Sequence, residues 1–378
     1  MKNFIFLFVS FVLYQADATA KIRRVGFFAS PTAGTDYTTF AAAYTAAVAN
    51  DTILMFPNNE VNGTLAKKLT IIGPGNWLDA NSTPKGNANL QAFAGIATVN
   101  TLILNPGCEG TVIMGMYGGV YYLNASDITL KRNRDIFVYI TASNTPNTVS
   151  NFQALQNYRL RIQNYYANNS SCTNMNISNN LINLFSTAAG NTYNGNIANN
   201  VWAYDVTQTA NALNGGASTL SDNNSIELGA GAYLLQNNIF ASYTNATATS
   251  NYNYYYFSNA GNSIFNYNMA LQAGSGVAQT WGTGTGNVIT PIANAANIFT
   301  AFPLIGTSSA DARYQLKAGS PALTAGAGNT AIGMFAGAYP YKLSTIPTIP
   351  TIYALSSPQG NNPPGNSIQI NVSARGNN

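Results

Sequence analysis

Histidine is absent from the 378-residue sequence, and charged residues make up only 7% of it. A chain without histidine excludes Ser-His-Asp and Cys-His nucleophiles and every histidine-ligated metal site. An average globular protein has about 25% charged residues. Because amphipathic helices need Glu, Lys and Arg on their exposed faces, an all-helical protein is not expected.

Uncharged residues take the polar positions instead. Asparagine alone occurs 53 times, while 46% of the chain is hydrophobic and 12% is aromatic. Disordered chains combine high net charge with few aromatic residues, so this composition argues for a folded protein. The net charge of +4 also gives no support to nucleic-acid binding, which depends on many phosphate contacts.

The first 20 residues have the three parts of a secretory signal peptide. Lys2 precedes an apolar run from Phe4 to Leu13, and Ala18-Thr19-Ala20 supplies a small-residue cleavage pattern. The apolar run is too short to span a bilayer, and no later apolar run is long enough. We therefore expect cleavage after Ala20, a secreted or cell-surface protein, and no membrane span.

Two cysteines, Cys108 and Cys172, stand 64 positions apart. In an oxidising compartment they could form a disulfide. The alternative is a pair of buried thiols, which behave as small apolar side chains. The spacing does not decide between these alternatives, and it suggests neither a metal site nor a cofactor.

Short strand-like runs recur from residue 67 onward, separated by Gly, Asn and Ser clusters. Each has an apolar residue, a small or polar one, polar positions rich in Asn, and then an apolar pair. The copies recur at steps of 15 to 38 residues, aligned on Leu130, Ile162, Ile177, Ile197, Leu235 and Phe265.

This repeat predicts a parallel solenoid in which each coil contributes short strands and turns. Asparagine suits the turns because it tolerates left-handed backbone, and stacked amides can form a ladder. The predicted structural column is Asn164, Asn179, Asn199 and Asn237. An antiparallel sandwich is the alternative, but Asn-Gly hairpin signals are few and the repeat keeps one orientation.

The two ends of the repeat region carry a resemblance. A predicted helix begins at Phe40, with Phe40, Tyr44 and Val48 on one face, and strands follow at 53–57 and 68–75. This order resembles the N-terminal cap and first coils of secreted right-handed parallel β-helix proteins of the pectate-lyase-like superfamily. The run from Tyr314 to Phe335 looks like the closing coil of bacterial members.

The resemblance implies an all-β, right-handed parallel β-helix with an N-terminal capping helix. We expect the signal peptide at 1–20, the β-helix domain at 21–340, and a Pro/Gly/Asn-rich extension at 341–378. The extension ends in a strand-like stretch, 367–373. That stretch either closes the core or acts as an assembly or anchoring tail.

Catalytic chemistry has little support. Relatives that cleave acidic polysaccharides use carboxylates to hold Ca²⁺ with an Arg or Lys base, or clustered aspartates. This chain has twelve acidic residues and no Asp-Asp, Asp-x-Asp or Asp-x-Glu pair. The nearest group is Asp205, Asp222 and Glu227, which we interpret as solvated turn residues. No catalytic residue and no metal ligand is assigned.

Two groups of residues are candidate contacts for a glycan or another partner. The first is a basic patch; the alternative is ordinary outward side chains neutralised by Asp127 and Asp135. The second is a tyrosine run, which could stack on sugars or simply pack on the helix. The candidates are Lys131, Arg132, Arg134, Arg159 and Arg161, and Tyr252, Tyr254, Tyr255 and Tyr256.

The sequence therefore favours an exported, non-catalytic protein of the cell surface or extracellular matrix. Its role would be structural, adhesive or glycan-contacting, with a polysaccharide or cell-surface partner, or with further copies of itself through self-association. The alternative is an enzyme, a polysaccharide lyase or glycoside hydrolase with an atypical site on the basic patch. Fold alone does not separate these two functions.

Overall fold

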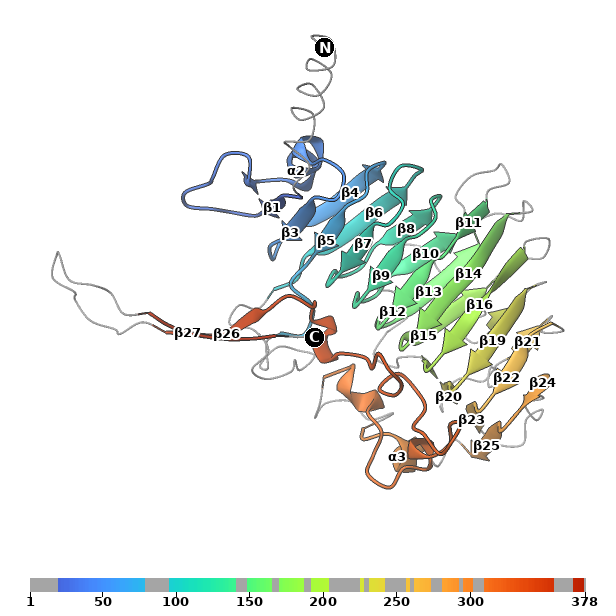
Figure 1. Cartoon of the computed structure of the whole chain (residues 1–378). Coiled ribbons are helices and arrows are strands. Elements are labelled where there is room, and N and C mark those ends of the chain that lie inside the picture. The colour runs from blue at the N-terminus through green and yellow to red at the C-terminus, as the bar shows by residue number, and fades with distance from the viewer. Residues whose placement is uncertain are drawn as a thin grey trace, which may run out of the picture.

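The computed structural model describes residues 20–78, 95–140, 148–164, 170–186, 192–203, 225–227, 231–241, 256–258, 262–272, 281–291, 295–301, 309–356 and 370–376. In this part of the chain, short strands stack into two long parallel sheets that run side by side along one axis (Figure 1). The predicted parallel β-helix is confirmed.

Sheet 1 contains thirteen of the described strands, and its neighbours along the stack are parallel. In chain order they are β1 (Ile22–Val25), β2 (Asp36–Tyr37), β3 (Thr52–Met55), β5 (Thr70–Ile72), β7 (Val112–Met114), β9 (Thr129–Lys131), β11 (Thr148–Ser150), β12 (Gln153–Leu155), β14 (Ser171–Ser178), β16 (Thr192–Ala198), β19 (Ala232–Gln236), β22 (Ile264–Asn266) and β24 (Thr283–Thr285).

Sheet 2 contains twelve of the described strands, again parallel. They are β4 (Glu60–Leu65), β6 (Thr98–Leu104), β8 (Val120–Leu123), β10 (Phe137–Ile140), β13 (Leu160–Asn164), β15 (Leu181–Ser186), β17 (Val201–Ala203), β18 (Ser225–Glu227), β20 (Ile239–Ala241), β21 (Tyr256–Ser258), β23 (Met269–Gln272) and β25 (Val288–Pro291).

The core lies between the two sheets, because alternate residues of every strand point inward. In sheet 1 the strand register places one inward residue of each coil on top of the next, and this row is fully buried. Its members are Ile53, Ile71, Ile113, Leu130, Ala154, Ile177, Ile197, Leu235 and Phe265. Stacked apolar rows of this kind let each coil bury its inner face on its neighbours.

One member of the predicted repeat, Ile162, does not align with the other copies in the structure. Ile162 lies in β13 of sheet 2, where it pairs with Val138 and Phe185. The residue of that coil that belongs to the sheet 1 row is Ala154. Both strands alternate apolar and polar residues, so the alternation could not distinguish them.

The N-terminal end is closed by α2 (Phe40–Ala46), which buries Phe40 and Ala43 against the first coil. Thr39 caps the helix by accepting a hydrogen bond from the Ala42 N–H at 3.3 Å. The helix is shorter than predicted. Val48 lies beyond its end, is 52% exposed, and donates its N–H to Asp51 Oδ2 at 3.0 Å.

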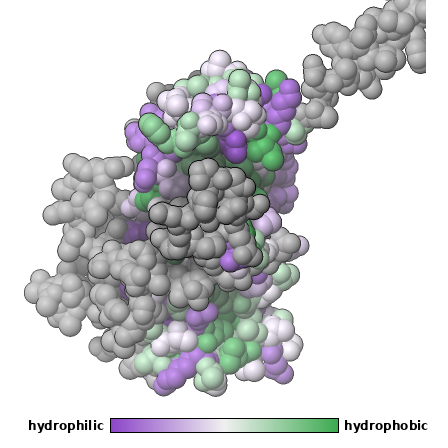
Figure 2. Space-filling view, turned by 90° about the vertical axis from the view of Figure 1, so that its left-hand side faces the viewer, coloured by the Kyte–Doolittle hydropathy of each residue, from purple (hydrophilic) through white to green (hydrophobic). Residues whose placement is uncertain are grey.

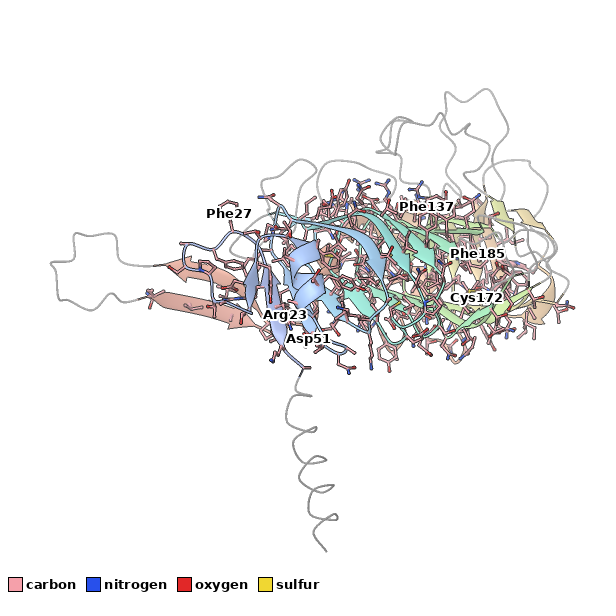
Figure 3. The ribbon with its side chains drawn as sticks, turned by 90° about the horizontal axis from the view of Figure 1, so that it is seen from above. Arg23, Phe27, Asp51, Phe137, Cys172 and Phe185 are labelled. Carbon is pink, nitrogen blue, oxygen red and sulfur yellow. The ribbon has the colours of Figure 1, made fainter. Side chains whose placement is uncertain are left out.

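Asp51 connects this cap to the preceding strand. Its Oδ1 accepts the Lys21 N–H and its Oδ2 accepts the Arg23 Nε–H, both at 2.8 Å, and Figure 3 labels Arg23 and Asp51 side by side at this end. The cap surface at the top of Figure 2 mixes hydrophilic and hydrophobic residues. Its exposed apolar residues include Ile22, Phe27, Val48 and Phe56.

Residues 309–350, which we call the strap, return along the outside of the solenoid. The strap contains three short 3₁₀ helices, η3 (Ala312–Tyr314), η4 (Pro321–Leu323) and η5 (Leu343–Thr345). The short helix α3 (Ala295–Ile298) precedes it in the chain. The strap packs Ile332, Met334 and Tyr341 on outward residues of sheet 2 such as Val201 and Ile239. The predicted closing coil is thus a covering segment on the flank.

Asp311 holds the two parts of the strap together. It accepts hydrogen bonds from Ser309 Oγ at 2.6 Å, the Ser344 N–H at 2.6 Å and Tyr341 Oη at 3.3 Å. Thr345 then accepts a bond at 2.7 Å from Asn76, near the N-terminal end of the stack. The boundary expected at residue 340 therefore falls inside the strap.

Beyond the strap, β26 (Thr351–Ser356) and β27 (Asn371–Arg375) form an antiparallel pair. Figure 1 shows that this pair, which we call the arm, projects sideways from the solenoid. The strand-like stretch expected at 367–373 is thus described from residue 370 onward, and β27 pairs with β26. It does not close the core.

Candidate functional site

From β7 onward, each coil leaves sheet 1 through one residue with left-handed backbone. The φ angles at this position lie between 54° and 71°. Its occupants, here called the turn column, are Gly115, Arg132, Gln156, Asn179, Asn199, Asn237, Tyr267 and Gly286. Glycine and asparagine adopt this conformation at low cost, which explains why asparagine recurs there.

The predicted asparagine column corresponds only partly to the turn column. Strand register places Asn179, Asn199 and Asn237 at the same position of three successive coils. Asn164 does not belong with them, because it lies in β13 of sheet 2 and pairs with Ile140.

The side chains that form hydrogen bonds from coil to coil belong to the residue that directly follows each turn-column residue from Arg132 onward in the chain. At this next position stands an asparagine, and in each such asparagine except the last the backbone N–H donates to Oδ1 of the asparagine one coil further on, at 2.8–3.0 Å. This asparagine ladder consists of Asn133, Asn157, Asn180, Asn200, Asn238, Asn268 and Asn287. The sequence-based column was therefore one residue out of register with the ladder.

Side chains of the turn column bind the strap. Asn179 Nδ2 donates to Met334 O at 3.0 Å and to Ala336 O at 2.6 Å. Gln156 Nε2 donates to Pro340 O at 2.6 Å. These amides satisfy strap carbonyls that have no partner within a strand, so the column attaches the strap.

Arg132 belongs to the same attachment and is not a surface cation. Its Nε donates to Gln156 Oε1 at 2.7 Å and its Nη1 to Ile346 O at 3.0 Å, and the residue is 2% exposed. Burial lowers the pKa of Arg132 to about 10, so it remains charged at neutral pH. The pKa of neighbouring Lys131 is also lowered, by burial and then by Arg132 and Lys342.

Arg134 and Arg159 are occupied in ion pairs with one carboxylate. Asp135 accepts from Arg134 Nε at 3.0 Å, and Arg159 Nε lies 2.8 Å from its other oxygen. The Arg134 guanidinium also lies between two rings, 4.1 Å from Trp77 and 4.8 Å from Tyr117. The expected neutralisation holds for Asp135, whereas Asp127 instead accepts a bond from Asn151 at 2.7 Å.

The basic patch is therefore divided by the fold. Lys131 and Arg132 lie where sheet 1 ends, beside the strap, while Arg134, Arg159 and Arg161 lie where sheet 2 begins. Around Asp135, three guanidinium groups face one carboxylate, a local excess of two positive charges. Arg161 is the arginine of this group that makes no ion pair within the described residues.

Arg161 lies over an aromatic cluster on the outer face of sheet 2. Its Cζ is 4.5 Å from the centre of the Phe137 ring, and the two residues are paired across β10 and β13. Phe137 and Tyr139 have ring centres 4.4 Å apart, and Tyr139 stacks on Tyr122 at 5.3 Å with a 14° interplanar angle. We call these four residues the aromatic–arginine surface.

All four residues of this surface are half-exposed, because strand alternation turns them away from the core. Figure 3 shows Phe137 at the outer rim, whereas Phe185 and Cys172 lie between the sheets. Burial, followed by the charge of Arg159, lowers the pKa of Arg161. An outward cation that makes no ion pair within the described residues, beside stacked rings, is chemically suited to flat, polar, ring-shaped ligands.

The sequence analysis missed three of these residues. In β8 the outward Tyr122 stands between the inward Tyr121 and Leu123, and in β10 the outward Phe137 and Tyr139 alternate with inward aliphatic residues. This alternation could have identified them. The predicted tyrosine run cannot be compared with the structure, since Tyr252, Tyr254 and Tyr255 lie outside the described residues. Tyr256 begins β21.

Half of the described carboxylates stabilise the fold through ion pairs or strap contacts. Asp36 pairs with Arg24 at 2.6 Å, Asp51 and Asp135 also pair with arginines, and Asp311 holds the strap. Among the residues that the structure describes, no group of three or more Cys, Asp or Glu side chains could hold a metal ion. Asp205 and Asp222 lie outside the described residues, and Glu227 ends β18.

The cysteines are two free, buried thiols. Burial raises the pKa of Cys108 to about 12 and also raises that of Cys172. Cys172 lies in β14 between the sheets. Neither thiol is therefore reactive in the folded protein.

Residues 1–19, which contain most of the predicted signal peptide, lie outside the described part of the chain. Over the described residues, every helix is too short or too polar to cross a bilayer. Comparisons of the chain with protein-family models, with curated proteins and with solved structures found no match.

Proposed function

We propose that the chain is an exported, non-catalytic β-helix protein of the cell surface or extracellular matrix, and that its aromatic–arginine surface contacts glycans. The observation that carries this proposal is the arrangement of Tyr122, Tyr139, Phe137 and Arg161 in one half-exposed cluster on a flat sheet. The export signal read from the sequence supports the location.

Sugar rings have apolar C–H faces that stack on aromatic rings, and polar rims that bind charged and hydrogen-bonding groups. The cluster offers both kinds of contact on neighbouring strands. A guanidinium held over the Phe137 ring is pre-oriented, so little side-chain freedom is lost when a ligand binds.

The use of half of the described carboxylates in ion pairs and strap contacts supports a non-catalytic role, because glycosidic cleavage by paired acids requires two free carboxyl groups. The resemblance to the pectate-lyase-like superfamily remains a proposal about relationship. A shared fold would not imply a shared activity.

A panel of immobilised neutral and acidic polysaccharides, assayed for binding and for cleavage products, tests this function. For the polysaccharide that binds, Tyr139→Ala should weaken binding about fivefold, the equivalent of about 1 kcal/mol for one ring contact. Arg161→Lys, which keeps the charge but loses the planar stack, should also weaken it.

Tyr339→Ala is the matched control, since Tyr339 is 71% exposed on the strap and should leave binding unchanged. Binding that survives Tyr139→Ala and Arg161→Lys together would exclude this surface as the contact site. Release of new chain ends by the unmodified protein would instead favour the alternative function, a lyase or hydrolase.

A further inference from the structure

The N-terminal end of the solenoid is covered by a helix, whereas the strands at the other end are exposed. At the N-terminal end α2 covers the first coil, and β1 also pairs with β2. At the other end, all three residues of β24 are exposed, and Val288 and Ile289 of β25 are each 43% exposed. Within the described residues, no strand pairs with the outer edge of β24 or of β25.

Among the described residues, the asparagine ladder also stops without a final acceptor at this end. Asn268 donates its N–H and Nδ2–H to Asn287 Oδ1, both at 3.0 Å. Asn287 donates Nδ2 backward to Phe265 O at 2.7 Å. In every earlier rung the backbone N–H and the second amide hydrogen bond the next coil, so at Asn287 these donors face outward from the stack.

A free edge of this kind is a template for another strand. Val288 donates its N–H back to Asn268 O at 2.8 Å. In a parallel strand successive N–H groups point to opposite sides, so the Ile289 N–H faces outward beside the donors of Asn287. The incoming strand must therefore supply carbonyl acceptors and an apolar side.

The arm has these properties. Its strands pair only with each other among the described residues, and a lone two-stranded pair is only marginally stable in water. Ile352 and Val372 are 44% and 55% exposed. Arg375 is the one charged residue in either strand, so the arm lacks the charges that usually protect exposed strand edges.

The arm cannot reach the open end of its own solenoid, which is the end formed by β24 and β25. The strap carries the chain back past Asn237, Asn179 and Gln156 to Arg132. From Arg132 to Gly286 the turn column makes six steps, about 29 Å at 4.8 Å per step, whereas a six-residue strand spans about 20 Å. Figure 1 also shows the arm pointing away from β24 and β25.

We propose that the arm of one copy of this protein pairs with the open end of a second copy, along β24 or β25. The contact joins two different surfaces, so it is heterologous and repeats head to tail, giving open chains of molecules. This inference does not depend on glycan binding.

Sedimentation velocity of the purified full chain from low to high micromolar concentration tests the proposal. Two variants are used, each with its fold checked by circular dichroism. Ile289→Pro removes the outward N–H while leaving the hydrogen bond of Val288 intact, a change that edge strands tolerate. Ile352→Lys with Val372→Lys places charges on the arm. Ile289→Lys replaces Ile289→Pro if the proline variant does not fold.

The unmodified protein should form a series of oligomers that grows with concentration. Each variant alone should associate at least about tenfold more weakly, and Val48→Lys, a control on the capped end, should behave as the unmodified protein does. An equimolar mixture of the two variants should form dimers but no longer chains, since one intact arm and one intact open end remain.

A monomeric unmodified protein over the whole concentration range would overturn the proposal. Oligomers that persist in either variant would do so as well. A mixture that stays monomeric although the unmodified protein associates would show that the contact uses other surfaces.

Discussion

Asn200 and Asn238 are 38 positions apart in the chain, yet both the backbone N and Nδ2 of Asn200 lie 3.0 Å from Oδ1 of Asn238. Both residues are fully buried. Asn200 also donates Nδ2 to Ile177 O, one coil back, at 2.8 Å. One uncharged side chain thus connects three coils without placing a charge in the interior, where an unpaired ion would be costly.

Removing the Asn200 side chain from the ladder should strongly destabilise the protein. Asn200→Ala leaves the N–H and Nδ2 of Asn180, and Ile177 O, without their partner in the core. Each unsatisfied buried group costs about 1–3 kcal/mol, and because the effects overlap we expect the free energy of unfolding to fall by about 3–5 kcal/mol. Chemical denaturation measures this change.

The matched control for Asn200→Ala is Asn196→Ala. Asn196 lies on β16 and faces outward, where its Oδ1 accepts one bond from Gln236 at 3.3 Å. We expect a loss of about 1 kcal/mol or less. Equal losses for the two variants would mean that the ladder does not contribute to stability in the way described.

Attachment of the strap should depend on Asn179. Asn179→Gly keeps the left-handed turn accessible but removes the bonds to Met334 O and Ala336 O, so we expect a loss of about 1–3 kcal/mol. Asn199→Gly is the control, because the Asn199 side chain makes no hydrogen bond within the described residues. Hydrogen exchange at residues 332–341 should rise for Asn179→Gly and not for Asn199→Gly.

Stability should respond to acid and not to changes near neutral pH. Burial of Asp51 would raise its pKa, but hydrogen bonds from the Lys21 and Val48 N–H groups and from Arg23 outweigh burial and lower it. The unfolded pKa is about 3.9. Because the folded pKa is lower, this stabilisation is complete above about pH 4 and is lost as the pH falls through the folded pKa.

With no histidine in the chain, the free energy of unfolding should be nearly constant from about pH 5 to pH 8. Asp51→Asn should lower it at neutral pH and weaken its dependence on pH below about pH 4. Denaturation series across pH measure both effects. A stability change centred near pH 6.5 would contradict this assignment.

The two thiols should be inert until the protein unfolds. Cys108 and Cys172 are fully buried, with pKa values raised by burial. Ellman's reagent should therefore titrate no thiol in the native protein and two in denaturant. A reducing agent should leave the melting temperature unchanged. A single labelled thiol in the native state, or a lower melting temperature after reduction, would contradict this prediction.

The solenoid could be predicted because its repeat is local: an inward apolar residue, a turn and a return strand recur in the same orientation. The ladder register could not be fixed by asparagine content alone, because two adjacent positions are both rich in it. A clue was present, however. The outward position also accepts Arg132, Gln156 and Tyr267, whereas the inward position holds asparagine in each of the corresponding coils.

The grouping of the arginines was only partly predictable. Arg134 and Asp135 lie in the turn 132–136 and Arg159 lies in the turn 156–159, and both turns are longer than those of later coils, such as 179–180. The length of these turns could not be predicted from the repeat. The strap was beyond sequence reasoning for a different reason. It binds through its own backbone carbonyls, and every residue has a carbonyl, so no side-chain pattern marks the contact.

The strap also changes how the molecule should come apart. In an ordinary repeat array each unit touches only its neighbours, so terminal units fray one at a time. Here a single covalent segment is fastened at Asn237, Asn179, Gln156, Arg132 and Asn76. A coil between Asn76 and Asn237 therefore cannot separate from its neighbours until the strap contacts break, so this part of the solenoid should unfold in one cooperative step.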